Sequence, residues 1–156
     1  MEIRLAKRED TSIILEFIKE LAEYEKMLDE VVCDVPTLEK WIFDENGAEV
    51  IFCVEDGKEV GFALFFHSFS TFLGRSGIFL EDLFVKPEYR GKGYGKALLV
   101  HLGKLADERG YGRIEWSCLD WNTPSIEFYK SLGAKEKLGW TDFRVAGEGI
   151  KNLSEM

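Results

Sequence analysis

Apolar residues recur along the chain with two different periods, and these periods predict its strands and helices. In the first part of the chain an alternating pattern predicts a short strand over Glu2–Lys7. Apolar residues then recur every three or four positions after Asp10, a good N-cap, which predicts a helix that runs to about Lys26. We expect Pro36 to open a second, shorter helix.

The middle of the chain has the pattern of a β-meander. We expect a strand over Val50–Glu55, a tight turn at Asp56-Gly57 and a return strand over Glu59–Ser68. A second turn, at Gly74–Gly77, should lead into a third strand over Ile78–Val85. Hairpin turns of this length join antiparallel strands, so the pattern predicts an antiparallel sheet here.

The last part of the chain alternates between helix and strand. A long helix should end near Gly110, followed by a strand over Ile114–Leu119, a helix over Thr123–Leu132 and a final strand around Trp140–Val145. This order predicts an α/β (α+β) fold with a mixed, mainly antiparallel central sheet and helices on both faces. Neither a linker nor a repeat interrupts the pattern, so we expect residues 1–156 to form a single domain.

The amino-acid composition indicates which kinds of molecule the protein can bind and where it can reside. The chain has 29 acidic and 20 basic residues, and the basic ones are scattered, which favours small cationic partners over nucleic acid. The longest apolar stretch, Val60–Phe66, is too short to span a membrane. Cys33, Cys53 and Cys118 are widely spaced, which is typical of free thiols in the cytoplasm. No histidine or cysteine pair has ligand spacing, so we expect no metal.

The most informative segment opens the long helix and reads Arg90-Gly91-Lys92-Gly93-Tyr94-Gly95-Lys96. Glycines at a helix start allow positive φ angles, and the free N–H groups with the helix dipole make a site for phosphate. A Walker loop needs Ser or Thr where Ala97 stands. A dinucleotide fingerprint read from Gly91 needs Gly or Ala where Lys96 stands, and read from Gly93 it meets Leu98. The segment therefore predicts another kind of phosphate-binding loop.

Two carboxylates, Glu81 and Asp82, lie in the third strand just before this loop. Simple alternation places Glu81 with Leu83 on one face and Asp82 with Leu80 and Phe84 on the other. A buried carboxylate without a partner is costly or has a raised pKa. Both could be solvated or salt-bridged in a sheet that splays here, but the neighbouring loop favours a functional role for at least one.

A second motif runs from Asn122 to Ala134. It has the pattern of a capped helix with Ile126, Tyr129 and Leu132 on one face. On periodicity alone Tyr129 belongs in the core, because aromatic residues on an apolar helix face usually do.

Four segments together resemble the spermidine/spermine branch of the GNAT N-acetyltransferases, which includes diamine and thialysine acetyltransferases. They are Leu21–Met27, Phe79–Val85, Arg90–Gly95 and Asn122–Ala134, and the resemblance covers nearly the whole chain in order. It implies a GNAT fold, acetyl-CoA as co-substrate and direct transfer of the acetyl group, in a ternary complex, to a primary amine of a small diamine, polyamine or lysine-like molecule. It also implies a homodimer that pairs through its C-terminal strands.

The resemblance implies a role for each matched residue. Tyr129 would be the general acid for the departing thiolate, and Glu81 would help to remove the amine proton. The amine site would be lined by Tyr24, Glu25, Glu81 and Asp82. Coenzyme contacts would come from the backbone of Leu83, Phe84 and Val85, from the loop residues Arg90, Gly91, Lys92, Gly93, Tyr94, Gly95 and Lys96, and from Asn122, Thr123, Pro124 and Ser125.

The chain differs from the polyamine enzymes it resembles between Ala134 and Gly139. The connection here is short and reads Lys135-Glu136-Lys137-Leu138, where those enzymes carry a longer and more acidic stretch. This difference favours a smaller amine, such as a lysine analogue. Two alternatives remain, a GNAT that acts on a protein or peptide amine and a coenzyme A-binding module without catalysis. The presence of both Glu81 and Tyr129 argues against the second.

Overall fold

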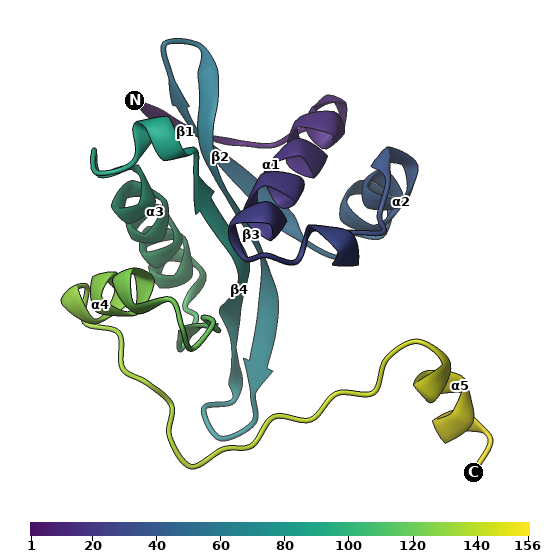
Figure 1. The fold of residues 1–156 in the computed structure, drawn as a ribbon. Coiled ribbons are helices and arrows are strands. Elements are labelled where there is room, and N and C mark those ends of the chain that lie inside the picture. Colours follow the sequence, from purple (N-terminus) through teal and green to yellow (C-terminus); the bar gives the residue numbers. More distant parts are fainter. The chain divides into compact units, whose positions relative to one another are not determined.

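Five strands form one sheet in the order β1-β2-β3-β4-β5 (Figure 1). The computed structural model describes residues 1–156, in two compact units, Met1–Ser117 and Cys118–Met156, and the sheet lies in the first. The strands are β1 Glu2–Leu5, β2 Glu49–Glu55, β3 Lys58–Ser70, β4 Arg75–Val85 and β5 Ile114–Trp116. All neighbours are antiparallel except β4 and β5, which confirms the predicted mixed, mainly antiparallel sheet.

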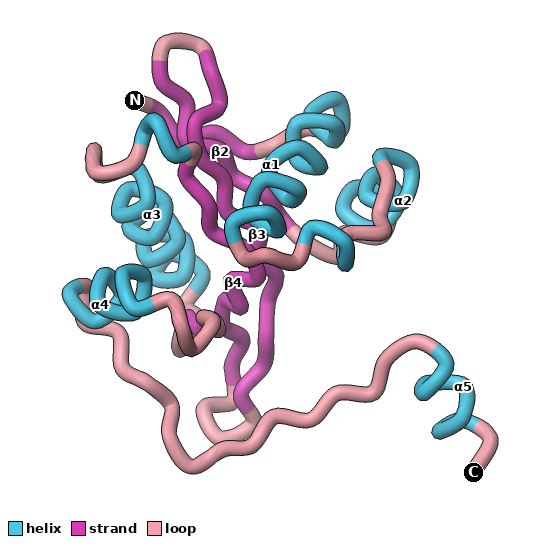
Figure 2. Tube along the Cα trace, viewed as in Figure 1, coloured by secondary structure: helices cyan, strands magenta, loops and turns pink.

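Helices and loops alternate with these strands (Figure 2). The first unit contains α1 Thr11–Tyr24, α2 Val35–Glu39 with the π-helical turn η3 Lys40–Asp44, α3 Tyr94–Arg109, and the 3₁₀ turns η1 Arg8–Asp10, η2 Leu28–Glu30 and η4 Pro87–Tyr89. The second unit contains α4 Thr123–Ser131 and α5 Glu148–Ser154, joined by a loop. None of the helices is both long and apolar enough to cross a membrane.

Two apolar cores cover the two faces of the sheet. One packs the buried face of α1, including Ile14 and Phe17, against Phe52, Phe62 and Phe84. The other packs α3 against the opposite face and contains Phe65, Ile78, Leu80, Leu98 and Leu102. Figure 1 shows α1 and α2 on one side of the sheet and α3 on the other, so helices lie on both faces as predicted.

A β-bulge interrupts the pairing of β3 with β4 beside the two carboxylates. Leu64 lies opposite Asp82, but the next residue of β3, Phe65, lies opposite Leu80. Glu81 is therefore an extra residue with no partner on β3. A bulge of this kind shifts the alternation of side chains by one position.

This bulge makes the predicted faces of β4 wrong. Simple alternation groups Leu80, Asp82 and Phe84 on one face, whereas Leu80 packs in the core beside α3 and Phe84 in the core beside α1. Asp82 pairs with Leu64 and therefore lies on the face that α1 covers. The physical reason is the extra residue, because strict period two holds only while the ladder is unbroken.

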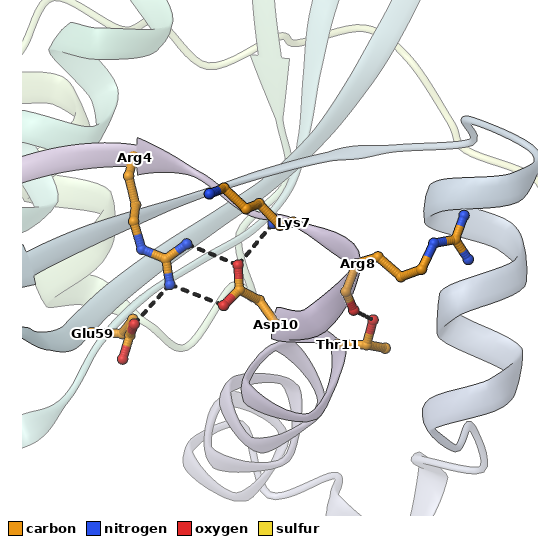
Figure 3. A network of polar contacts seen from close by, with 6 residues as sticks. All are labelled: Arg4, Lys7, Arg8, Asp10, Thr11 and Glu59. Carbon is orange, nitrogen blue, oxygen red and sulfur yellow. Dashed lines mark hydrogen bonds and ion pairs between the residues drawn. The ribbon is translucent and has the colours of Figure 1, made fainter.

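A polar network fixes the start of α1 (Figure 3). The Arg4 guanidinium donates to both oxygens of Asp10, at 2.8 and 3.0 Å, and to Glu59 at 2.7 Å. Asp10 also accepts from the backbone N–H of Lys7 at 2.7 Å. The expected N-cap of α1 is at Asp10, but its carboxylate makes no capping bond to the helix, because Arg4 and Lys7 occupy it.

Three other predicted elements differ from the structure. The turn expected at Gly74–Gly77 lies earlier, and Arg75 already belongs to β4. The strand expected over Ile114–Leu119 ends at Trp116. The strand expected around Trp140–Val145 is irregular, and the chain instead forms α5, which the sequence analysis did not predict. A strand needs neighbouring backbone to satisfy its hydrogen bonds, and residues 140–145 pair with no strand of the chain.

Candidate active site

The glycine loop between β4 and α3 has the geometry of an anion site. Gly91 and Gly93 have φ angles of 76° and 87°, in the left-handed region that favours glycine. Gly93 is the N-cap of α3, and no side chain caps this helix end. A Cβ placed on either glycine would meet no atom within 4 Å, so the backbone faces open space. The N–H groups of a 16-residue helix thus meet a surface that a phosphate can approach.

The end of β4 offers backbone groups beside this loop. β5 pairs with β4 only over Ile78–Leu80, so Leu83, Phe84 and Val85 lie beyond the last rung of that ladder. An extended ligand can bind such an edge as an added strand does. The carbonyl oxygen of Val85 accepts a hydrogen bond from Nε of Arg90 at 2.9 Å, so strand end and loop are joined directly.

An acidic cluster of Glu25, Glu81 and Asp82 lies near the end of β4. Asp82 is half-buried, and its burial, followed by the charges of Glu81 and Glu25, raises its pKa to about 7. Burial also raises the pKa of Glu25, which follows the last residue of α1. Glu81 itself is exposed. No group of three or more His, Cys, Asp or Glu side chains in the structure is arranged to hold a metal ion. The cluster offers negative charge and a proton acceptor.

Tyr24 brings the end of α1 to the same region. Its ring centre lies 6.5 Å from that of Phe84 and 4.9 Å from the guanidinium carbon of Arg90. The structure therefore gathers the amine-site candidates Tyr24, Glu25 and Asp82 around the end of β4. The contact between Arg90 and Tyr24 joins a predicted coenzyme residue to a predicted amine residue. This contact is not predictable from the sequence, because the two residues are far apart in the chain and no periodicity relates them.

The remaining candidates lie in the second unit. Asn122 is buried, caps α4 and accepts from the backbone N–H of Ser125 at 3.4 Å. Tyr129 is half-buried, with its ring centre 5.6 Å from that of Phe128. No residue of α4 is buried, so the core position that periodicity alone favours for Tyr129 is wrong.

Comparison with known proteins identifies the family. The sequence model of the Acetyltransferase (GNAT) family matches residues 15–134, which include the glycine loop, both carboxylates of β4 and Tyr129. This chain belongs to the GNAT acetyltransferase family. The match begins in the first compact unit of this GNAT chain and ends within the second, at residue 134.

Curated relatives place the GNAT chain near enzymes that act on small amines. A thialysine N-epsilon-acetyltransferase from Sus scrofa is 38% identical over 97% of this chain and 96% of its own length. An L-ornithine N5-acetyltransferase from Arabidopsis thaliana is 35% identical over 78% of this chain and 50% of its own length. Among solved structures, an integron cassette protein from V. cholerae has a TM-score of 0.82 at 28% identity, and covers 99% of this chain and 98% of its own.

Proposed function

We propose that this GNAT enzyme transfers the acetyl group of acetyl-CoA to a primary amine of a small cationic molecule. The observation that carries the proposal is the cluster of Glu25, Glu81 and Asp82 beside the coenzyme loop, with the pKa of Asp82 raised to about 7. Such a cluster attracts an ammonium group and contains a proton acceptor matched to neutral pH. Relatives that acetylate thialysine support the same substrate class.

The residues of the loop and strand end fit acetyl-CoA. The open backbone at Gly91 and Gly93, with the uncapped start of α3, would hold the diphosphate, and Arg90, Lys92 and Lys96 would add positive charge. Leu83, Phe84 and Val85 would pair through their backbone with the pantetheine arm. In the second unit, Asn122, Thr123, Pro124 and Ser125 would contact the coenzyme near its acetyl end. Acetyl-CoA supplies the activated acyl carbon and the thiolate leaving group.

The carboxylates perform the first proton transfer. An alkyl ammonium cannot attack, since its lone pair carries a proton at neutral pH. Glu81 would take this proton, through a water molecule if needed, while Asp82 and Glu25 hold the cation. Asp82 is a second proton acceptor because its pKa lies near 7. The neutral nitrogen then bonds to the acetyl carbon and passes its surplus proton to the Asp82 carboxylate. The carbon–sulfur bond breaks, the thiolate takes a proton from the Tyr129 hydroxyl, and water returns a proton to the Tyr129 oxygen.

The preferred acceptor in this proposal is lysine-like. The nearly full-length relatives include thialysine acetyltransferases, and the ornithine enzyme also acts on an amino acid with a side-chain amine. The connection Lys135–Leu138 is short, and its one carboxylate, Glu136, lies between two lysines and pairs with Lys130 at 3.5 Å, so it adds no second acidic site for the far amine of a polyamine. The side-chain amine of a lysine-like molecule needs only the one cluster.

The proposal includes a single catalytic domain that works as a homodimer in the cytoplasm. The family match, which continues from the first unit into the second, supports one domain. Exposed apolar side chains after α4, among them Trp140, Phe143 and Val145, support a second copy as partner. All three cysteines are free thiols, which supports a reducing compartment.

A thiol-release assay tests this function. Acetyl-CoA is supplied with thialysine, lysine, ornithine, diamines, spermidine and lysine-containing peptides, each at matched concentration. We expect the highest kcat/KM with thialysine or another lysine-like amine. Preference for peptides would favour a protein-acting GNAT. Absence of thiol release with every amine, together with binding of coenzyme A measured by calorimetry, would favour a binding module and contradict the proposed function.

A further inference from the structure

Arg90 makes three contacts that no other loop residue makes. Its Nε–H donates to the carbonyl oxygen of Val85 at 2.9 Å. Its guanidinium carbon lies 4.9 Å from the ring centre of Tyr24 and 5.1 Å from that of Phe84. One planar cation therefore contacts aromatic rings from α1 and from β4, and is tied to the backbone at the end of β4.

The terminal nitrogens of Arg90 remain available for another ligand. The side chain is exposed, and its only hydrogen bond in the structure uses Nε. A guanidinium carries four further N–H donors on its two Nη atoms, which can contact a phosphate while the flat face stays on an aromatic ring. The two sets of contacts are therefore compatible, and an anion bound at the loop would fix the side chain over Tyr24 more firmly.

Tyr24 in turn is followed directly by one member of the acidic cluster, Glu25. Tyr24 is the last residue of α1, and Glu25 is the C-cap. Three backbone hydrogen bonds close this helix end, from Glu25 to Leu21, from Lys26 to Glu23 and from Met27 to Ala22, all between 2.8 and 3.0 Å. Tyr24 and Glu25 thus belong to one hydrogen-bonded helix end, and a contact that holds the Tyr24 ring also restrains the backbone that bears Glu25.

We propose that Arg90 is a positioning residue for the amine site as well as a cation for the coenzyme, so that coenzyme binding orders the amine site through Tyr24. The proposal rests on the proposed function and adds a coupling between its two substrates. Because coupling between two ligands is reciprocal, acetyl-CoA should tighten amine binding by the same factor as amine tightens acetyl-CoA binding. If Arg90 served only to bind phosphate, its replacement would leave the amine KM unchanged.

Steady-state kinetics with a matched pair of variants tests the coupling. Lys92 is the control, because it is a cation of the same loop whose ammonium lies over Tyr89, 5.5 Å from its ring centre. Lys92→Ala should raise the KM of acetyl-CoA and leave the amine KM within about 2-fold. Arg90→Lys keeps the charge but loses the planar stack and the Nε donor, so the amine KM at saturating acetyl-CoA should rise by roughly 5-fold or more, with a smaller fall in kcat.

Variants of the ring complete this test. Tyr24→Phe keeps the ring under the guanidinium and should behave nearly as the wild type in coupling. Tyr24→Leu should raise the amine KM as Arg90→Lys does, and the double variant should show little further loss, since both remove the same contact. If Arg90→Lys raises only the acetyl-CoA KM, the coupling is absent and the proposal is overturned.

Hydrogen exchange separates this inference from the proposed function. Backbone N–H groups of Glu23–Met27 should exchange more slowly in wild-type protein when coenzyme A is added, and this protection should be lost in Arg90→Lys but kept in Lys92→Ala at saturating coenzyme A. Turnover in the amine panel without such protection would overturn the coupling and leave the enzyme assignment intact. Protection without turnover would support the coupling and contradict the proposed reaction. Failure to bind coenzyme A would overturn both.

Discussion

Asp82 lies directly opposite Leu64 across the β3–β4 ladder, on the face of the sheet that α1 covers. The neighbouring Glu81 has no partner across the ladder and is exposed. Two adjacent carboxylates of one strand therefore have different surroundings, since one is placed beside an apolar core and the other in solvent. This difference is why burial raises the pKa of Asp82 to about 7.

The first prediction concerns stability and pH. The folded-state pKa of Asp82, about 7, lies above its ordinary value of 3.8, so the folded protein holds this proton more tightly than the unfolded chain. The contribution of Asp82 to the free energy of unfolding should therefore fall as pH rises from about 4 to 7. Asp82→Asn removes this loss, and should be more stable than wild type by roughly 1–3 kcal/mol at pH 8.5 and nearly equal at pH 4.

Urea unfolding at these two pH values checks this expectation. Asp107→Asn, on the exposed face of α3, is the matched control and should change stability little. If wild type and Asp82→Asn have the same free energy of unfolding at pH 8.5, the charged form of Asp82 does not destabilise the folded protein. The same Asn variant should lose activity, because a stabilising change at a functional group often costs function.

The second prediction assigns the amine proton to Glu81. Glu81→Gln keeps the size of the side chain but cannot accept a proton, so coenzyme affinity should persist while the amine KM rises and kcat falls at pH 7. The rate should recover partly at alkaline pH, because more of the amine is then already neutral. Glu108→Gln, at the exposed end of α3, is the control. If the rate of Glu81→Gln depends on pH in the same way as that of wild type, Glu81 is not the base and Asp82 is the better candidate for the proton acceptor.

The sequence predicted the order of elements because most of them follow local rules. Period, capping and turn residues place α1, α3 and the β2–β3 hairpin correctly. The tight turn at Asp56-Gly57 has φ angles of 50° and 76° at its two residues, as the Asp-Gly pair predicts. These features depend on residues within a few positions of each other, so a single sequence contains them.

The bulge at Glu81 and the contact of Arg90 with Tyr24 could not be predicted in the same way. A bulge is a property of the pairing between two strands, and the sequence of β4 alone does not reveal which residue is left out. The stack of Arg90 on Tyr24 joins α1 to a loop far along the chain. Motifs in the sequence thus identify the residues of the site. The surroundings that set their pKa values and couple them to one another can be known only from the folded structure.

The third prediction tests the anion loop. Gly93→Ala adds a Cβ at a φ of 87°, which strains the backbone and occupies the open space that the diphosphate needs. The Kd of coenzyme A should rise by roughly 10-fold or more, equivalent to about 1.4 kcal/mol, as measured by calorimetry. Gly110→Ala, at a φ of 70° beyond the other end of α3, imposes similar strain away from the loop and should lower stability without changing this Kd.

A second glycine control separates strain from helix propensity. Gly103 lies within α3, and a Cβ there would meet no atom within 4 Å. Gly103→Ala should stabilise the protein by about 0.5–1 kcal/mol and leave the coenzyme Kd unchanged. Equal coenzyme affinity in wild type and Gly93→Ala would contradict the assignment of the diphosphate to this loop.

The fourth prediction concerns the homodimer. Val145 is 54% exposed in the irregular segment after α4, close in sequence to exposed Trp140 and Phe143. If a second copy covers this segment, Val145→Glu buries a charge at the interface and should shift the protein toward a monomer near 17.9 kDa. Val32→Glu changes an equally apolar residue, 93% exposed near α2, and should leave the mass unchanged. Sedimentation equilibrium at micromolar concentration distinguishes these outcomes, and a monomeric wild type would rule out the proposed dimer.

The last prediction isolates the hydroxyl of Tyr129. Tyr129→Phe keeps the ring, which lies 5.6 Å from that of Phe128, and therefore keeps the packing of α4. Stability and the Kd of coenzyme A should stay near wild type, while kcat should fall by roughly 10²–10⁴-fold if the hydroxyl protonates the leaving thiolate. Tyr111→Phe removes a hydroxyl just beyond the end of α3 and controls for the loss of one polar group. Replacing acetyl-CoA by an acetyl thioester with a more acidic thiol should restore part of the rate in Tyr129→Phe, because a better leaving group needs less proton transfer. Near-normal turnover of Tyr129→Phe with acetyl-CoA would leave the thiolate without its proposed acid and assign this tyrosine a packing role on α4.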